Sequence, residues 1–438
     1  MELNFSRTID KDGFVVFLNG KGFRFPYPRE IWGPFPFKET LTDELMFLWL
    51  VAVPILSRSK KVVFRARKPI FFETYLKWMR AELPALAAHS WTDSALYLKL
   101  KFDSLVYEFE QEPAPPIHFE TDERNSILNF TSGAESLASL RIAREMGLSV
   151  FGMFHRDVRY PEQFESVSGH FSAIEKKFDF KIDVIENELN ALLSRKAWGY
   201  KRSAVTCALE IQKFFLMSLP FAHFRRAKTL LFGNEVEYNF PIARGRGPNF
   251  LNPIRTLTGM EQMNDWMQTL TSGSVQISSL LAGSHLMRIQ KIIHLRAPEY
   301  GSFQISCRWS GVTSNGRWCL DCDTCAEAYL HAVAFGRNPI PELGFQESML
   351  SQKKKKFFTS FRCFDQKNLL QVHLSNQERL CAEMASKIGN QEWIVHEILK
   401  LNYPVSHETK TRYLASNLPW STLPLLDESE HAIQNLLA

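Results

Sequence analysis

A short apolar run that ends in a turn of small residues, Ile127 to Ser136, constrains the fold of this 438-residue chain more than any other stretch. The run has the composition of a buried strand, and Leu137 to Met146 then repeats apolar residues at the spacing of a helix. Such a turn presents backbone N–H groups and a helix N-terminus to an anion, and Gly133 allows close approach. Hydroxyl groups are supplied by Thr131, Ser132 and Ser136. The stretch therefore predicts either a phosphate-binding loop or an ordinary strand–helix turn with a serine N-cap.

The region after this turn alternates between strand-like and helix-like segments. Strands are expected at residues 148–154, 180–185 and 228–232, and helices at 161–178, 203–219 and 277–295. This alternation predicts a parallel sheet with helices on both faces. Ligands of such sheets bind beyond the carboxyl ends of the strands, where Thr131, His155 and Gly233 are expected to lie.

Four cysteines near residue 320 form the pattern C-x11-C-x2-C-x2-C. They are Cys307, Cys319, Cys322 and Cys325. Four thiolates, three of them closely spaced, suit a tetrahedral structural zinc site, and an iron–sulfur cluster is the alternative. The remaining cysteines, Cys207, Cys363 and Cys381, are isolated, which argues against a disulfide framework and for a reducing, cytoplasmic location.

Together, the loop and the cysteines resemble the QueC family, the 7-cyano-7-deazaguanine synthases of the PP-loop ATPase superfamily. The family loop reads S-G-G-x-D-S, and the segment in register with it is Thr131-Ser132-Gly133-Ala134-Glu135-Ser136. The family also carries a late Ser-Cys pair before C-G-x-C-x-x-C, as Ser306-Cys307 precedes Cys319 to Cys325 here. The resemblance spans about residues 126 to 339 and implies a PP-loop fold that binds ATP, Mg²⁺ and Zn²⁺.

Three further segments resemble the family more loosely. His155-Arg156, Lys201-Arg202 and Gly233-Asn234-Glu235-Val236-Glu237-Tyr238 each stand where the family carries a charged or Gly-Asn motif. For each, solvated surface charge or ordinary helix-end charge is the competing interpretation. The catalytic residues that the resemblance implies are Glu135, Ser136 and Arg202. The nucleotide-binding residues that it implies are Thr131, Ser132, Gly133, Ala134, Ser136, His155, Gly233 and Asn234. Candidates for a basic residue that the family often carries after residue 277 are His285, Arg288 and Lys291.

The chain extends well beyond the resembling region at both ends. Residues 1–120 are expected to form a mixed α/β domain with strands at 13–18 and 61–65, helices at 42–53 and 71–83, and a hairpin over 95–109. Residues 121–345 form the expected PP-loop domain with its zinc knuckle, and residues 346–438 a helical extension. The aromatic segment from Gly22 to Pro28 is expected to pack against the next domain, with a docking surface as the alternative.

Bulk properties narrow the class of protein. The net charge of +5 is mild, so it fits an anionic ligand without demanding nucleic acid. The run Lys353 to Lys356 is expected to be a solvated face. The N-terminus does not resemble a signal peptide, and no apolar run is long enough to span a bilayer, so no membrane partner is expected.

The resemblance implies that ATP activates a carboxylate, that of 7-carboxy-7-deazaguanine, as an acyl-adenylate. Ordinary QueC proteins are about half as long and capture this intermediate with ammonia, giving a nitrile after a second ATP. The extra segments resemble the longer QueC-like proteins of anti-phage systems (type IV CBASS and Qat), which couple the deazaguanine to a protein N-terminal amine. The expected function is therefore an ATP-dependent C–N ligase with an acceptor protein encoded nearby. The alternatives are a plain nitrile synthase and an inactive, zinc-stapled binding module.

Overall fold

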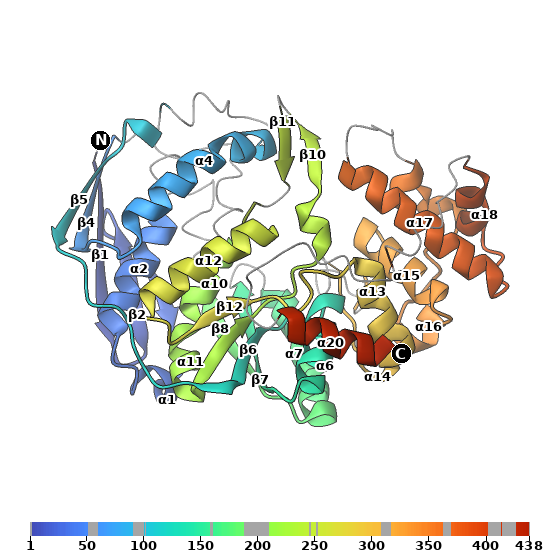
Figure 1. Ribbon diagram of the computed structural model, residues 1–438, viewed down its shortest axis with the longest axis horizontal. Helices are drawn as coiled ribbons and strands as arrows, with labels where there is room; N and C mark the ends of the chain where they lie inside the picture. Colours follow the sequence, from blue (N-terminus) through green and yellow to red (C-terminus); the bar gives the residue numbers. More distant parts are fainter. Residues whose placement is uncertain are drawn as a thin grey trace.

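The computed structural model describes residues 2–50, 60–90, 100, 102–157, 161–187, 210–244, 247–250, 253–307, 317–361, 369–401, 413 and 426–437. It is a mixed α/β structure with two five-stranded sheets and flanking helices, which confirms the expected class. The N-terminal sheet and the helices between residues 369 and 400 lie at opposite ends of the long axis, with the second sheet between them, whereas the last helix (Leu426–Leu437) lies back beside the second sheet region (Figure 1). Lys201, Arg202, Cys207 and Cys363 lie outside the described residues.

The N-terminal sheet has the strand order β3-β2-β1-β4-β5. Its strands are β1 (Glu2–Asp10), β2 (Gly13–Leu18), β3 (Lys21–Pro26), β4 (Lys61–Arg67) and β5 (Val106–Gln111). β1 to β3 form an antiparallel meander, whereas β1, β4 and β5 are parallel. The predicted hairpin over 95–109 is wrong, because residues 102 and 103 are helical and β5 pairs in parallel with β4.

Two helices cover this sheet through aromatic contacts. α2 (Lys38–Leu50) places Phe47 with its ring centroid 6.0 Å from that of Phe64 on β4. α4 (Phe72–Ser90) places Phe72 4.9 Å from Phe109 on β5. A short helix, α1 (Arg29–Trp32), follows the meander. Edge-to-face and tilted ring pairs of this kind anchor helices on a sheet.

The second sheet is parallel throughout, with the order β12-β9-β6-β7-β8. Its strands are β6 (Asp122–Asn129), β7 (Ser149–Asp157), β8 (Ile182–Asn187), β9 (Ala227–Leu231) and β12 (Gln276–Ser278). The helices along this stretch are α6 (Ala134–Glu145), α7 (Pro161–Phe178), α10 (Glu210–Met217), α11 (Leu219–Arg225) and α12 (Leu257–Leu270). From β6 the chain adds β7 and then β8 on one side of the sheet. It then crosses to the other side of β6, where it adds β9 and finally β12. This is a doubly wound order, and its switch point lies between β6 and β9.

Two predicted helices differ from the structure. The helix predicted at 203–219 is confirmed over α10 in the described residues, but it ends at Met217. Leu219 begins α11, and Pro220, its second residue, cannot continue α10. The helix predicted at 277–295 begins with strand β12, where Ile277 pairs with Leu230 of β9. Helical structure starts only at α13 (Leu286–Lys291) and continues through a π-helical turn, η4 (Ile292–Arg296), and α14 (Pro298–Gly301).

The two sheets share one hydrophobic core. Phe23, Phe25 and Tyr27 are all buried in it. The Tyr27 hydroxyl donates a hydrogen bond to the Met217 carbonyl oxygen (3.2 Å), and the Tyr27 ring contacts Phe221 of α11. The expectation that the aromatic segment packs against the following region is confirmed. The same burial excludes these side chains as a docking surface.

The C-terminal region consists of helices in its described parts. They are α15 (Asp323–Ala334), α16 (Pro339–Leu343), α17 (Leu369–Lys387), α18 (Trp393–Lys400) and α20 (Leu426–Leu437), with short 3₁₀ turns η5 (Gln352–Phe357) and η6 (Thr359–Phe361). α17 packs between α15 and α18 (Figure 1), and its Arg379 donates to the carbonyl oxygens of Ile398 and Leu399 at the end of α18. None of the helices in the described parts of the chain has the length and apolar character needed to cross a bilayer.

Candidate functional site

A cavity of about 610 Å³ opens at the carboxyl ends of β6 and β9, beside the switch point of the parallel sheet. Its wall combines segments that are far apart in the sequence. The lining residues include Thr131, Gly133, Glu135, Phe154, Glu235, Glu237, Tyr238, Arg255, Leu286, Ser306, Cys307, Thr324, Glu327, Leu370 and Leu374. A volume of this size suits a nucleotide or another small molecule.

The loop that resembles a PP-loop has an unusual backbone at Ser132. Its φ is +58°, in the left-handed region that favours glycine. The Ser132 hydroxyl donates to the Phe303 carbonyl oxygen (2.7 Å) and lies 3.1 Å from His170 Nε2. The family loop has glycine at this position, so these hydrogen bonds offset the strain of a serine there.

The loop residues divide into those that face the cavity and those that shape the turn. Thr131, Gly133 and Glu135 line the cavity. Ser136 is buried, and its hydroxyl donates to the Gly133 carbonyl oxygen (3.1 Å). The hydroxyls of Ser132 and Ser136 are therefore already engaged within the protein, and Ala134 is buried as the first residue of α6.

The N-terminus of α6 faces this loop without a capping side chain. Gly133 is the N-cap and no side chain of the described residues caps it. The first N–H groups of an uncapped helix attract an anion. Glu135 competes for this position, because its carboxylate oxygen Oε2 lies 2.9 Å from where a Cβ on Gly133 would stand.

Gly233 and Asn234 lie in the loop after β9, the second of the two strands that flank the switch point. A Cβ on Gly233 would lie 2.7 Å from the Cβ of Glu135, so only glycine permits this approach. Asn234 is buried and exchanges hydrogen bonds with Ser279, whose hydroxyl donates to the Asn234 carbonyl oxygen (2.7 Å). Its side-chain amide faces Met260 Sδ (2.9 Å). Both residues therefore position the loop, and neither lines the cavity.

Carboxylates dominate the electrostatics of the cavity. Burial raises the pKa of Glu135, and it raises that of Glu235 well above its usual range, with Glu135 and Glu237 adding repulsion. Burial likewise raises the pKa of Glu327 to about 8. Arg255 stacks on Tyr238 and donates to its hydroxyl. Burial of Arg255 lowers its pKa, but Tyr238 and the neighbouring carboxylates outweigh this and raise it. Such a site is suited to a cation, or to an anion that arrives with cations.

His155 is placed differently from its prediction. β7 continues to Asp157, so His155 and Arg156 lie within the strand rather than beyond its end. His155 packs on Phe214, at 4.2 Å between ring centroids, and burial lowers its pKa to about 3. Arg156 pairs with Glu186 on β8 (2.7 Å). Neither residue lines the cavity; Phe154, one position earlier, does.

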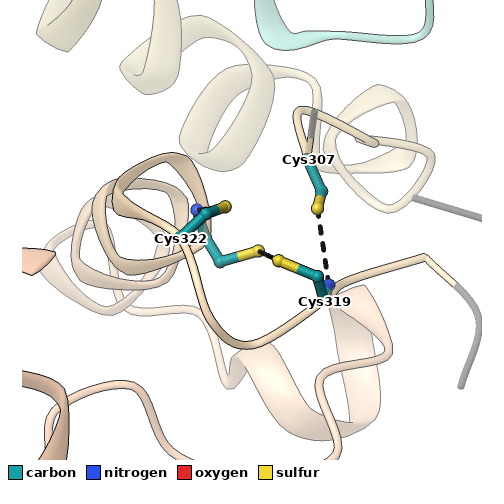
Figure 2. Close-up of side chains that lie close together, drawn as sticks. Cys307, Cys319 and Cys322 are labelled. Atoms are coloured by element: carbon teal, nitrogen blue, oxygen red, sulfur yellow. Dashed lines mark hydrogen bonds between the residues drawn. The ribbon is translucent and has the colours of Figure 1, made fainter. Parts of the chain in front are cut away.

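The four predicted zinc ligands meet at one point. The thiol groups of Cys307, Cys319, Cys322 and Cys325 all lie within 4.8 Å of one another. Figure 2 shows the Cys307, Cys319 and Cys322 side chains converging beside the start of α15. The sulfur atoms of Cys319 and Cys325 are 3.8 Å apart, which matches the separation of about 3.8 Å that two Zn–S bonds of about 2.3 Å give at a tetrahedral angle. The cluster could hold a metal ion such as zinc.

Backbone N–H groups support this cysteine cluster. The N–H groups of Cys319 and Asp321 donate to Cys307 Sγ and Cys319 Sγ, both at 3.4 Å, and Cys325 N–H donates to Cys322 Sγ (3.3 Å). Such bonds stabilise thiolate ligands.

Lys354, in the lysine run, donates to the Leu320 carbonyl oxygen (2.7 Å), whereas Lys353, Lys355 and Lys356 are exposed. The expected solvated face is confirmed for those three lysines.

Two lining residues, Arg255 and Glu327, were missed by the sequence-based prediction. Arg255 lies just before α12, whose N-cap Thr256 accepts a hydrogen bond from Gly259 N–H. Because that helix was not predicted from the sequence, the position of Arg255 in the cavity wall could not be predicted either. Glu327 lies two residues after Cys325 on α15, and its acidic character was the signal available. No protein-family model matches the chain, and a search of curated proteins finds no match.

Proposed function

We propose that the chain uses ATP to adenylate the carboxylate of 7-carboxy-7-deazaguanine and couples the acyl group to an amine. The observation that supports this most directly is the uncapped N-terminus of α6, which faces a cavity of about 610 Å³ at the switch point of a doubly wound sheet. The position suits the pyrophosphate of a nucleotide. The neighbouring cysteine cluster strengthens the resemblance to QueC, because Cys307 lines the same cavity.

The chemistry assigns roles to the lining residues. The Thr131 hydroxyl and the backbone at Gly133 hold pyrophosphate, while Ser132 and Ser136 maintain the loop through their internal hydrogen bonds. Mg²⁺ held by Glu135 and Glu235 would neutralise the triphosphate, and those buried carboxylates fit a hard cation. Arg255, a half-buried cation in the wall, stabilises negative charge that develops at the α-phosphate.

The reaction forms one bond and breaks another at each step. A carboxylate oxygen attacks the α-phosphorus of ATP, and pyrophosphate leaves. The neutral amine then attacks the acyl carbon, AMP leaves and the nitrogen loses a proton. We propose a protein N-terminus as this amine, since an α-amino pKa of about 7.7–8.0 leaves a neutral fraction near pH 7 that a lysine at about 10.4 does not. Burial of Phe23 to Tyr27 means that the acceptor contacts another part of the surface.

A second function, a binding module without turnover, is favoured by one observation. The Glu135 carboxylate occupies the space beside the helix N-terminus that a phosphate would use. In that case the cavity binds a cation or a cationic group and hydrolyses nothing. The plain nitrile synthase shares the adenylation step but captures the acyl group with ammonia and uses a second ATP to form the nitrile.

The test combines the purified protein with ATP, Mg²⁺, 7-carboxy-7-deazaguanine and the protein encoded beside it. AMP, pyrophosphate and an acyl mass gain on the first residue of that protein are the expected products. Gly133→Val should abolish AMP release, because the valine side chain would collide with the side chains of Glu135 and Thr131. Gly169→Ala on α7, where an added Cβ meets nothing within 4 Å, is the matched control. ADP as product, or no turnover at all, contradicts the proposal, and free nitrile supports the plain synthase.

A further inference from the structure

Glu237, His285 and His373 meet in the interior beside the cavity, although they come from three separate segments. Glu237 lies in the 3₁₀ turn η2 (Val236–Asn239) after β9, His285 is the N-cap of α13, and His373 lies on α17. Their exposed fractions are 7%, 1% and 6%. One potential ligand atom from each lies within 4.8 Å of the other two.

The distances fit a shared cation. Glu237 Oε1 is 3.1 Å from His373 Nε2 and 3.5 Å from His285 Nδ1. Two metal–ligand bonds of about 2.0–2.1 Å at a tetrahedral angle place their donor atoms about 3.3 Å apart. The amide of Gln377 lies 2.7 Å from both Glu237 Oε1 and His373 Nε2. Rotated by half a turn, it would present its carbonyl oxygen as a fourth donor.

The second carboxylate oxygen gives an independent indication. Oε2 of Glu237 is buried and has no hydrogen-bond partner among the described residues. A buried carboxylate oxygen without a partner is costly, and a cation bound through both oxygens of the carboxylate would remove that cost. Oε1 accepts a hydrogen bond from the Leu286 N–H (2.9 Å), which holds the carboxylate in place.

Aromatic rings enclose the cluster. The Phe240 ring lies 4.2 Å from His373, and Tyr413 packs edge-on against His285 at 5.2 Å. The Tyr413 hydroxyl also donates to the His373 carbonyl oxygen (3.2 Å), which fixes this turn of α17. Two imidazoles and a carboxylate in an apolar shell are a donor set for zinc and related divalent transition metals, not for Mg²⁺ or Ca²⁺.

We propose that Glu237, His285 and His373 hold a second divalent transition-metal ion, Zn²⁺ by its donor chemistry, separate from the cysteine cluster. The ion joins the turn after β9, the start of α13 and helix α17. Since Glu237 lines the cavity and Leu370 and Leu374 of α17 form the adjacent wall, the ion fixes the C-terminal helices to the cavity. This inference does not depend on the proposed reaction.

The experiment measures metal content and ligand type together. Purified protein is dialysed against micromolar Zn²⁺, and bound metal is counted by elemental analysis. The variants are His373→Gln and His285→Ala for the new site, and Cys322→Ser for the cysteine cluster. Exposed His396→Ala on α18 is the matched histidine control. Cobalt substitution distinguishes the two sites, because only thiolate ligands give sulfur-to-cobalt charge-transfer absorption.

We expect two equivalents of zinc in the native chain and in His396→Ala, and one in each of the other variants. Cobalt in Cys322→Ser should show ligand-field bands without the charge-transfer absorption, which identifies nitrogen and oxygen ligands in a protein whose histidines are intact. A single equivalent in the native chain, or no cobalt bound by Cys322→Ser, overturns the proposal. Those results would show that the three side chains form a hydrogen-bonded network without a metal.

Discussion

Gly233, two residues after β9, lies directly against Glu135 at the start of α6, so that a Cβ on residue 233 would stand 2.7 Å from the Cβ of Glu135 and 3.1 Å from its carbonyl carbon. The contact joins the two loops on either side of the switch point. It holds Glu135, which lines the cavity, at the place where the proposed pyrophosphate lies. A methyl group there has no room unless α6 or the β9 loop moves.

Gly233→Ala should therefore destabilise the fold by about 1–3 kcal/mol and weaken nucleotide binding, since it separates the two loops. Denaturant unfolding and ATP binding measure the two effects. Gly169→Ala, in the exposed middle of α7, should be neutral or stabilise by up to about 1 kcal/mol. Unchanged stability in Gly233→Ala would contradict the close packing of the two loops.

Ser132 combines a left-handed backbone with two polar contacts, and substitutions can separate these effects. Ser132→Gly loses the hydroxyl but relieves the backbone strain, whereas Ser132→Ala loses the hydroxyl and keeps the strain. The alanine variant should therefore be less stable than the glycine variant by about 1 kcal/mol. Urea unfolding of both proteins checks this order, and equal stabilities would argue against the left-handed conformation.

His170 makes stability depend on pH. Burial lowers its pKa to about 4, although its Nε2–H donates to the Phe303 carbonyl oxygen (2.6 Å). The unfolded chain takes up this proton first, near pH 6.5, so the contribution is complete above that pH and is lost as the pH falls toward 4. Between pH 7.5 and 4.5, wild type should lose about 1–3 kcal/mol more than His170→Gln.

Unfolding free energies at the two pH values give this difference directly. His431→Gln, on the exposed side of α20, is the control and should follow wild type. A His170→Gln protein whose stability falls as steeply as that of wild type would assign the acid sensitivity to other groups.

Cys325 should be required for one metal ion and for the packing of α15. Cys325→Ser is expected to lose one equivalent of zinc and about 2–5 kcal/mol of stability, because the knuckle loses a ligand and its cross-link. Cys381 is equally buried, lies outside the cluster and contacts Met287 Sδ at 4.0 Å. Cys381→Ala should keep the full metal content. Stoichiometric iron with sulfide in the native protein would refute the zinc assignment.

Local patterns predicted the regular elements well. The helix expected at 161–178 has those bounds in the structure, because Pro161 suits a first helical position and Asp179 ends the helix in a left-handed conformation. The strand–turn–helix at Ile127 to Ser136 and the meeting of the four cysteines were also predictable, since both are encoded by residues close in sequence.

Features that depend on tertiary packing were not predictable in the same way. The segment from Ile277 to Leu295 has a helical pattern, but Ile277 completes the sheet edge beside Leu230, and this pairing overrides the local pattern. The Glu237, His285 and His373 cluster joins segments that no spacing rule connects. Asn234 was expected to bind the nucleotide, but its side-chain amide instead contacts Met260 Sδ and so fixes the loop after β9.

The cavity wall includes residues from Thr131 to Leu374, with α17 supplying its last part. A polypeptide emerging from the ribosome therefore lacks a complete cavity until α17 has been synthesised and docked. Any catalysis at this site must begin after translation has passed that helix. Fragments of the chain that end before α17 lack Leu370 and Leu374 of the cavity wall, so they should not bind a ligand at this site as the whole chain does.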